Sequence, residues 1–419
     1  MLSTNSWIFK KLVLITVFFN SGFLFLTDDK RAGIPYFREL YLVALLIFSI
    51  LLLQKYKTFL PKNLKVFIAF ISLAWLSSAI FSYMKFEQPI YYGILEERRF
   101  AFFFLIIPLY IALASRTITI KNIEKTVLIS LLFCILLALL YAINIIPDNQ
   151  SVSFKVEKWV EFTNDLRHET RYPFGAHTAT LVFIMCAVYL KNTGSLTSRK
   201  GLLIIFIMII VILFQWFIIQ KRSTMLLWML AFIFSWPFSL KKTIQAFFIF
   251  TPILMLATLL FSETINTQYE KLLYLWNELF IPFEERTRYL TTSIILNELE
   301  ENLYIGMGAL SLQWEQGFSR FYGESFFLSD LGQFGILYRY GFLTPFIYLY
   351  YIFFIISLLR NNTNLNYRKL VAFVFFTPLL ISFSLLLNYG GQLISIPLAI
   401  LLYSKYLDKQ TPNHVRKIY

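Results

Sequence analysis

The sequence predicts an all-α polytopic membrane protein, and three observations lead to this. Apolar residues make up 58% of the 419 residues and aromatic residues 19%, and the mean hydropathy is +0.64. Such values are unusual for soluble globular chains. The apolar residues form runs close to the ~20 residues that a helix needs to cross a bilayer. Loops between alternate runs carry Lys or Arg, as cytoplasmic loops of membrane proteins do.

The runs predict about twelve transmembrane helices. They cover residues 7–26, 37–53, 66–84, 100–114, 127–145, 172–190, 202–219, 224–238, 247–261, 336–359, 371–387 and 393–403. No run of small residues typical of a cleavage site follows the first segment, so we expect a retained helix rather than a signal peptide.

We divide the chain into three parts. Residues 1–261 hold helices 1 to 9, with a polar loop at 146–171. Residues 262–335 form a large polar loop with amphipathic helices, between helices 9 and 10. Residues 336–419 hold helices 10 to 12 and a basic tail. Because function on such proteins often lies in loops over a membrane cavity, we expect the large loop to carry a catalytic lid.

Basic residues set the expected orientation. Lys-containing loops at 54–65, 115–125, 191–201, 239–243 and 360–369, and the basic tail at 409–419, all fall on one side. The positive-inside rule assigns that side to the cytoplasm, so both termini are expected there. The polar loops 146–171 and 262–335 are then expected on the outer side.

Other features argue against several classes of site. The net charge of +14 is explained by basic cytoplasmic loops, so we expect no nucleic-acid partner. Cys134 and Cys186 both lie inside apolar runs, which favours neither a disulfide nor a metal site. His168 and His177 lie close to acidic residues, so a metal site is conceivable there. The spacing of these residues matches no known ligand set, and we favour acceptor binding for His168 and His177.

The basic residues on the outer side are mostly arginines. They are Arg31, Arg38, Arg98, Arg99, Arg167, Arg171, Arg222, Arg286, Arg288, Arg320 and Arg339. Guanidinium groups bind phosphate oxygens in pairs and stay charged in partly dry sites. The pattern therefore predicts an anionic, phosphate-bearing ligand at the outer leaflet. The alternative is that these side chains reach lipid headgroups or pair with neighbouring carboxylates, such as Glu96, Glu97, Glu284 and Glu285.

Helical geometry places two of these arginines, Arg286 and Arg288, on different faces of one predicted helix. At 100° per residue, Ile295 and Leu299 lie within about 20° of Arg288, whereas Arg286 lies on the face of Glu300. A charge on an apolar face is costly without a partner. We therefore expect Arg288 to face a counter-charge or a bound anion, and Arg286 to be a surface residue.

Arg222 precedes the predicted helix at 224–238, where Ser223 and Thr224 are possible caps. A helix N-terminus offers free N–H groups and partial positive charge, so Arg222 could complete an anion site there. The alternative is a headgroup anchor.

Three features follow one another along the chain. They are Arg222 before a mid-chain span, Arg288 before "GMG" at 306–308, and "SDLGQFGILYRYGFL" at 329–343. Their order and spacing resemble the O-antigen ligase and polysaccharide polymerase superfamily. The resemblance in topology covers most of the chain, but the motifs match only within 221–341. It implies a GT-C-type glycosyltransferase of the bacterial inner membrane. Such enzymes use a glycan on undecaprenyl pyrophosphate at the periplasmic face.

The resemblance also implies roles for single residues. Arg222 and Arg288 are expected to hold the lipid pyrophosphate. Ligases of the family carry a His about eleven residues before a Gly that opens the next span, and here that position is Asp330. This departure favours polymerase over ligase. Asp330 is the first candidate general base and Glu324 the second, although Asp330 could instead cap a helix or pair with Arg339.

The implied reaction is attack by an acceptor sugar hydroxyl on the anomeric carbon of the donor, with undecaprenyl pyrophosphate leaving. Preorganised arginines can stabilise the developing negative charge, so neither a metal nor another cofactor is expected. A general base would add about 10² to 10⁴ in rate. Additional substrate-binding candidates are Arg98, Arg99, Arg171, His177, Arg320 and Arg339.

The expected partners are the lipid-linked donor, a glycan or lipid A-core acceptor, and membrane lipids. A polysaccharide or lipid transporter, or flippase, is the main alternative. Transporters usually carry ionisable residues near mid-membrane, whereas here the charges gather at helix ends. A purely structural membrane subunit would leave the arginine asymmetry unexplained.

Overall fold

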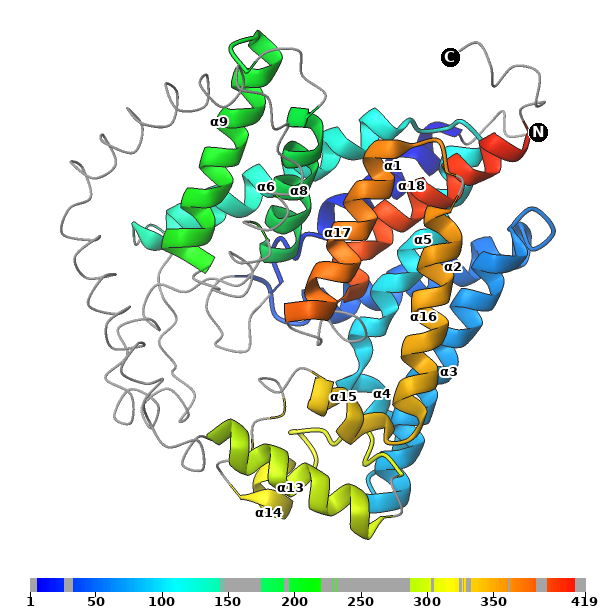
Figure 1. Cartoon of the computed structure of the whole chain (residues 1–419), viewed down its shortest axis with the longest axis vertical. Coiled ribbons are helices and arrows are strands. Elements are labelled where there is room, and N and C mark those ends of the chain that lie inside the picture. Colours follow the sequence, from blue (N-terminus) through cyan, green and yellow to red (C-terminus); the bar gives the residue numbers. More distant parts are fainter. Residues whose placement is uncertain are drawn as a thin grey trace.

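The computed structural model is all-helical within the residues that it describes, apart from isolated β-bridges (Figure 1). This confirms the all-α part of the predicted fold class, whereas the twelve spans and the sidedness of the large loop stay predictions. The described residues are 6–25, 33–143, 145, 175–191, 196–219, 228, 232, 287–302, 305–323, 326, 328, 333–360, 362–381 and 390–410.

The helices before residue 220 are α1 (Ser6–Phe19), α2 (Phe37–Lys55), α3 (Lys62–Phe86), α4 (Ile90–Glu96), the 3₁₀ helix η1 (Arg98–Leu105), α5 (Ile106–Ala114), α6 (Ile120–Ala142), α8 (Ala176–Lys191), α9 (Arg199–Phe214) and the π-helix η2 (Gln215–Ile219). The later helices are α13 (Thr287–Glu301), α14 (Phe318–Tyr322), α15 (Gln333–Tyr340), α16 (Leu343–Leu359), α17 (Leu365–Ile381) and α18 (Gly390–Gln410).

Three helices in the described part of the chain are long and apolar enough to cross a membrane: α2, α3 and α6. Shorter apolar helices are found at Ala176–Leu190, Leu343–Leu359 and Gly391–Leu407. The predicted spans at 224–238 and 247–261 lie outside the described residues, apart from two helical positions at 228 and 232.

The centre of the bundle is the continuous segment formed by η1 and α5. Every residue from Phe100 to Leu113 is buried. A helix that is apolar on all sides must be covered on all sides, and α1, α2, α3 and α18 pack around this one. The predicted span at 100–114 is thus helical and forms the core of the molecule.

The outer helices expose apolar faces. On α16, Phe346, Leu349 and Phe353 recur on one helix face and are 65%, 51% and 66% exposed. On α2, Leu40 and Ile47 are 66% and 54% exposed. Exposed apolar stripes of this kind are rare on soluble monomers and typical of surfaces that face lipid. The fold is therefore that of a helical protein with a membrane-like surface.

The predicted span at 336–359 is broken in two. Gly341 has φ +50°, and its N–H donates to Leu337 O over 2.7 Å, so α15 ends there and α16 begins at Leu343. An antiparallel bridge joins Ile305 to Gly341. The start of this predicted span therefore belongs to a separate structure at the end of the bundle, because pairing with Ile305 interrupts the helix.

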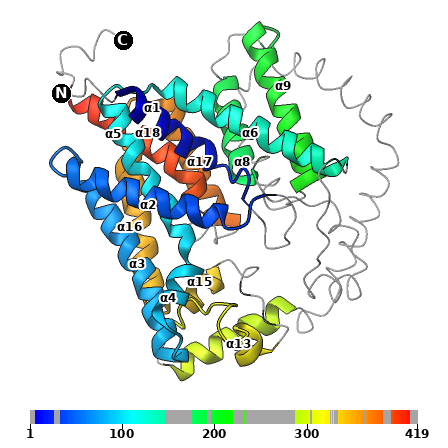
Figure 2. The ribbon, with the colours of Figure 1, turned by 180° about the vertical axis from the view of Figure 1, so that it is seen from behind.

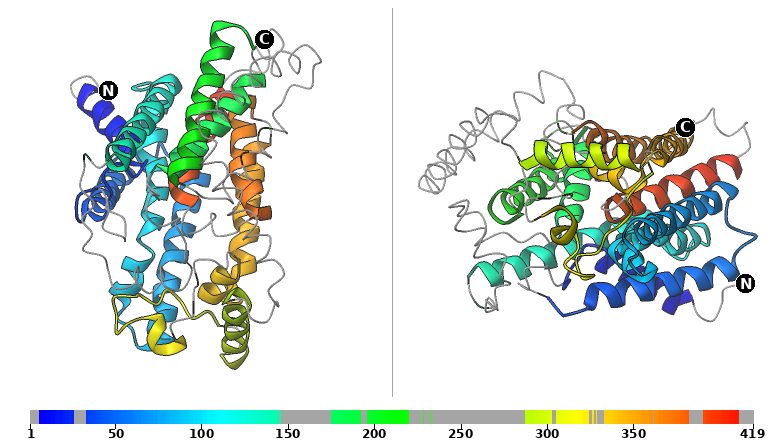
Figure 3. Two further views of the ribbon diagram at one scale, coloured as in Figure 1. Left: turned by 90° about the vertical axis from the view of Figure 1, so that its left-hand side faces the viewer. Right: turned by 90° about the horizontal axis from the view of Figure 1, so that it is seen from below.

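That separate structure, here called the lid, consists of α13, α14, α15 and the described residues between them. It has its own small hydrophobic core, formed by Ile295, Leu299, Met307, Leu310, Phe326, Leu328 and Tyr338 together with Phe86 of α3. Figures 1 and 3 show the lid packed at one end of the bundle, beside the C-terminal end of α3. The predicted outer loop thus contains a folded helical layer.

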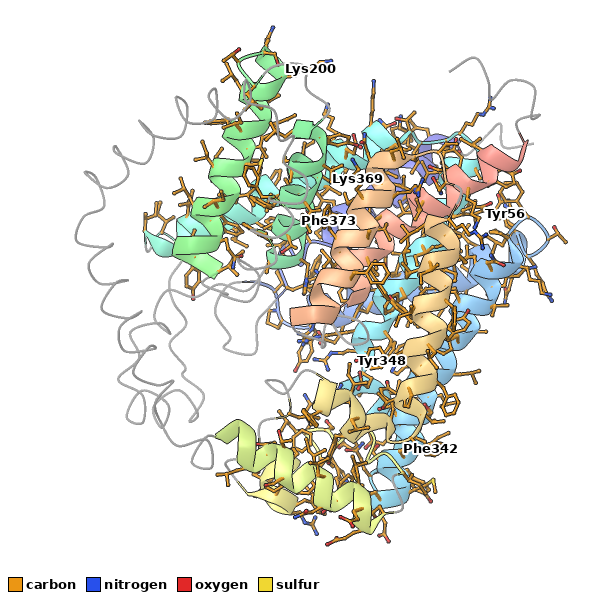
Figure 4. The ribbon with its side chains drawn as sticks, viewed as in Figure 1. Tyr56, Lys200, Phe342, Tyr348, Lys369 and Phe373 are labelled. Atoms are coloured by element: carbon orange, nitrogen blue, oxygen red, sulfur yellow. The ribbon has the colours of Figure 1, made fainter. Side chains whose placement is uncertain are left out.

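Described residues from three of the predicted basic loops lie away from the lid. Lys200 of α9, Lys369 of α17 and Tyr56 after α2 are found towards the opposite end of the molecule, whereas Phe342 is beside the lid (Figure 4). The start of α1 and the end of α18 are also far from the lid (Figure 1). This arrangement agrees with the sorting of Lys-rich loops to one side of the chain.

Candidate functional site

The "GMG" sequence is a docking segment between α15 and α3. Met307 N–H donates to Tyr338 O over 2.7 Å, and Gly308 N–H donates to Arg339 O over 3.1 Å. These bonds satisfy carbonyls at the C-terminus of α15 that have no helical partner. Ala309 N–H donates to Ser78 O of α3 over 3.1 Å. The segment therefore joins the lid to a membrane helix.

Glycine is required at both positions by close approach of other backbones. A Cβ on Gly306 would lie 2.3 Å from Arg339 O. A Cβ on Gly308 would lie 2.2 Å from both Ser78 O and Ser82 N, and Gly308 has φ +75°. Only glycine avoids both the strain and the clash. The motif thus serves packing of the lid against α15 and α3.

Gln88, in the turn between α3 and α4, fixes the next residues of the lid. It is fully buried. Its amide nitrogen donates to Ala309 O and to Ser82 Oγ, each over 3.0 Å, and its amide oxygen accepts from Ser311 N–H over 2.7 Å. One side chain therefore satisfies two buried backbone groups of the lid, and this favours a single docked position.

A buried ion pair connects the lid to the start of the central helix. The Arg339 guanidinium of α15 binds the Glu97 carboxylate, which is only 1% exposed, at the junction of α4 and η1. Burial raises the pKa of Glu97, and Arg339 offsets part of that rise. Burial alone would lower the pKa of Arg339, but Glu97 reverses this and the net direction is upward. Arg339 therefore remains a cation in a largely dry place.

A second set of charges lies beside this pair. Glu39 Oε1 accepts from Arg98 Nε over 3.0 Å and from Arg38 Nε over 3.0 Å. Arg98 also donates to Leu95 O over 2.7 Å. Burial and the like charge of Arg38 lower the pKa of Arg98, while Glu39 acts in the other direction. The carboxylate of Glu39 thus holds two guanidinium groups in fixed positions.

These charges form one group, which we call the arginine cluster. Its members are Arg38, Arg98, Arg99 and Arg339 with Glu39, Glu96 and Glu97. Four guanidinium groups face three carboxylates in this part of the structure. The cluster joins α2, the α4–η1 junction and the lid, and its members are far apart in sequence.

Arg288 stands in the first turn of α13. The predicted apolar face of this helix is indeed the buried one, since Ile295 is 0% and Leu299 2% exposed. Arg288 occupies the same helical register as these two residues. Because α13 packs against α15, the lid brings the helix of Arg288 next to the helix of Arg339. At the other end of α13, Glu298 pairs with Lys85 of α3 over 3.0 Å.

The other predicted site residues are not gathered in the cluster or lie outside the described residues. Arg320 of α14 pairs with the exposed Glu315. His177 is the second residue of α8 and is half-buried. Five candidates lie outside the described residues: His168, Arg171, Arg222, Glu324 and Asp330. Within the described residues, no group of three or more His, Cys, Asp and Glu side chains could hold a metal ion.

Sequence reasoning missed Gln88. It also named Glu97 only as one possible neighbour of the outer arginines. The one sequence signal for Gln88 is a polar residue directly before Pro89, between two apolar helices. Two of its three partners are backbone groups more than 200 positions away, and no local pattern encodes such contacts.

The fold and the site together define a helical protein with candidate membrane spans and a folded lid that is tied to the central helix by charge. No known family model, no curated protein and no solved structure matches this chain.

Proposed function

We propose that this protein is a membrane glycosyltransferase that moves a glycan from undecaprenyl pyrophosphate to an acceptor sugar hydroxyl. The observation that carries the proposal is the arginine cluster at the seam between lid and bundle. A partly buried group of guanidiniums in fixed positions suits an anionic, phosphate-bearing ligand. Its position at helix ends suits a lipid whose headgroup lies at the membrane surface.

Arg288 and Arg222 would bind the pyrophosphate of the donor. Arg288 lies in the first turn of α13, which packs against α15, and Arg222 precedes the predicted span at 224–238. As the bond between the anomeric carbon and the pyrophosphate oxygen breaks, negative charge grows on the leaving group. Guanidinium groups already in position stabilise that charge without reorganisation.

Within the cluster, Glu97 and Glu39 would act as positioning residues. Each holds a guanidinium in one geometry through an ion pair. Arg98, Arg99 and Arg339 would then bind donor phosphate or acceptor sugar oxygens without moving far. Asp330 is proposed as the general base that accepts the proton of the acceptor hydroxyl, and Glu324 is the second choice.

Polymerase is favoured over ligase because Asp330 replaces the His of the ligases. The test uses purified full-length protein in proteoliposomes with lipid-linked repeat units, first alone and then with lipid A-core. Longer lipid-linked chains in the absence of core would support polymerisation. Product that forms only on core would assign the protein as a ligase instead.

The site is tested by Arg288→Ala and Arg222→Ala, with Arg286→Ala as the matched control two residues from Arg288. We expect the first two variants to lose transfer by at least 10²-fold, as loss of one transition-state charge partner does. Arg286→Ala should retain transfer. Full transfer by Arg288→Ala would refute the site. Movement of lipid-linked glycan across the bilayer without any new glycosidic bond would indicate a flippase.

A further inference from the structure

An apolar groove lies between α2 and α3, away from the lid. Figure 2 shows the two helices diverging from the short turn that joins them. The groove between them has a volume of about 710 Å³. Its floor contains Ile68 and Phe104, which are 5% and 7% exposed, and its rim contains Ile50 and Leu76, which are 44% and 45% exposed.

The groove is almost entirely apolar along its length. Other lining residues are Leu46, Leu53, Ala69, Ser72, Trp75 and Ile94. The hydroxyl of Ser72 donates to Ile68 O over 2.8 Å, and the Trp75 indole N–H donates to Ile94 O over 3.0 Å. Both polar groups are thus satisfied inside the protein. Since α2 and α3 are both candidate membrane spans, an open groove between them faces hydrocarbon, and its occupant must be apolar.

One end of the groove is strongly basic. Lys57 and Lys65 line it where α2 and α3 meet, together with Gln54. Lys65 Nζ donates to Lys57 O over 3.1 Å, which holds this ammonium at the mouth of the groove. Lys55 ends α2 and Lys62 begins α3 beside this turn, and the sequence from 40 to 86 has no Asp or Glu. In α2, α3 and the turn between them, the one carboxylate that could balance this positive charge is therefore Glu39, at the far end of α2.

We propose that the groove binds an anionic phospholipid of the membrane. Its acyl chain lies along Ile68, Ala69 and Phe104, and its phosphate is bound by Lys57 and Lys65. Lysine is an effective point charge for phosphate, and lysines beside a membrane attract anionic headgroups. The apolar groove matches the apolar tail of such a lipid, and the lysine pair at its end matches the anionic headgroup. This site is independent of the proposed transferase function.

The test uses the purified full-length protein in detergent and measures lipid binding by native mass spectrometry. The probes are phosphatidylglycerol and phosphatidylcholine with identical acyl chains. We expect phosphatidylglycerol to bind more tightly. The double variant Lys57→Gln and Lys65→Gln should weaken its binding roughly 30-fold and remove the preference. The control is Lys121→Gln with Lys125→Gln, an exposed lysine pair at the start of α6, and it should leave binding unchanged.

A second pair of variants tests the groove. Ala69→Phe places a ring in the groove and should weaken both lipids, whereas Val66→Phe, on the same helix but outside the groove, should not. The lysine variants alter exposed or half-exposed side chains, so they test the proposal even where Ala69→Phe fails to fold. Equal binding of the two lipids by the unmodified protein would refute the proposal. So would displacement of phosphatidylglycerol from the unmodified protein by undecaprenyl phosphate, because the groove would then hold a polyprenyl chain.

Discussion

Replacing Gln88 with Met should undock the "GMG" segment while leaving the membrane helices folded. Methionine matches the length of glutamine but can make none of its three hydrogen bonds. The Ala309 carbonyl and the Ser311 N–H would then be left buried without their partner. Each such group costs about 1–3 kcal/mol, so the docked state should lose about 2–6 kcal/mol. Even the lower figure corresponds to a roughly 30-fold larger open population.

Hydrogen exchange measured by mass spectrometry on the purified protein checks this. Amides of residues 307–311 should exchange at least 30-fold faster in Gln88→Met, because local opening governs their exchange. Peptides from the centre of α5 should not change. The control is Gln313→Met, which makes the same chemical change at an exposed position of the same loop. Unchanged protection of 307–311 in Gln88→Met would refute the idea that this side chain holds the lid.

Two further predictions concern the lid. Glu97→Ala leaves Arg339 buried without its carboxylate and should lower the free energy of unfolding by about 3–5 kcal/mol. Glu315→Ala breaks an exposed pair and should lower it by at most about 1 kcal/mol. Thermal unfolding measures both, and equal shifts in the two variants would contradict this prediction. Gly308→Ala adds a Cβ 2.2 Å from two backbone atoms and should expose the lid to proteolysis. Gly323→Ala, which shares a positive φ but has open space around it, should cost only about 1–2 kcal/mol of strain.

Much of the fold could be predicted because membrane helices are encoded locally. Runs of apolar residues of sufficient length must be helical in lipid, since every backbone group has to bond within its own segment. This is why the segments at 37–53 and 66–84 fall on α2 and α3. The error at 336–359 has a clear cause. The run is apolar apart from a few residues such as Arg339, and only pairing with Ile305 shows that Gly341 ends one helix before another begins.

The candidate site was predictable only in part. Helical register identified the buried face of α13 from Ile295 and Leu299, because the 3.6-residue repeat is a local property. It could not show that Arg339 would pair with Glu97, although pairing with such neighbours was one of the alternatives. The choice between pairing and ligand binding depends on distances between residues about 240 positions apart.

The sequence by itself determined that the protein is helical and has long apolar helices suited to a membrane, because hydropathy needs no knowledge of long-range contacts. Only the tertiary structure decided that "GMG" is a docking segment, that Gln88 fixes it, and that the arginines around Glu97 and Glu39 form one cluster. The physical reason is that close backbone contacts and buried ion pairs depend on partners from helices that are distant in sequence. Their positions emerge only when the central helix has been surrounded and the lid has closed on its end.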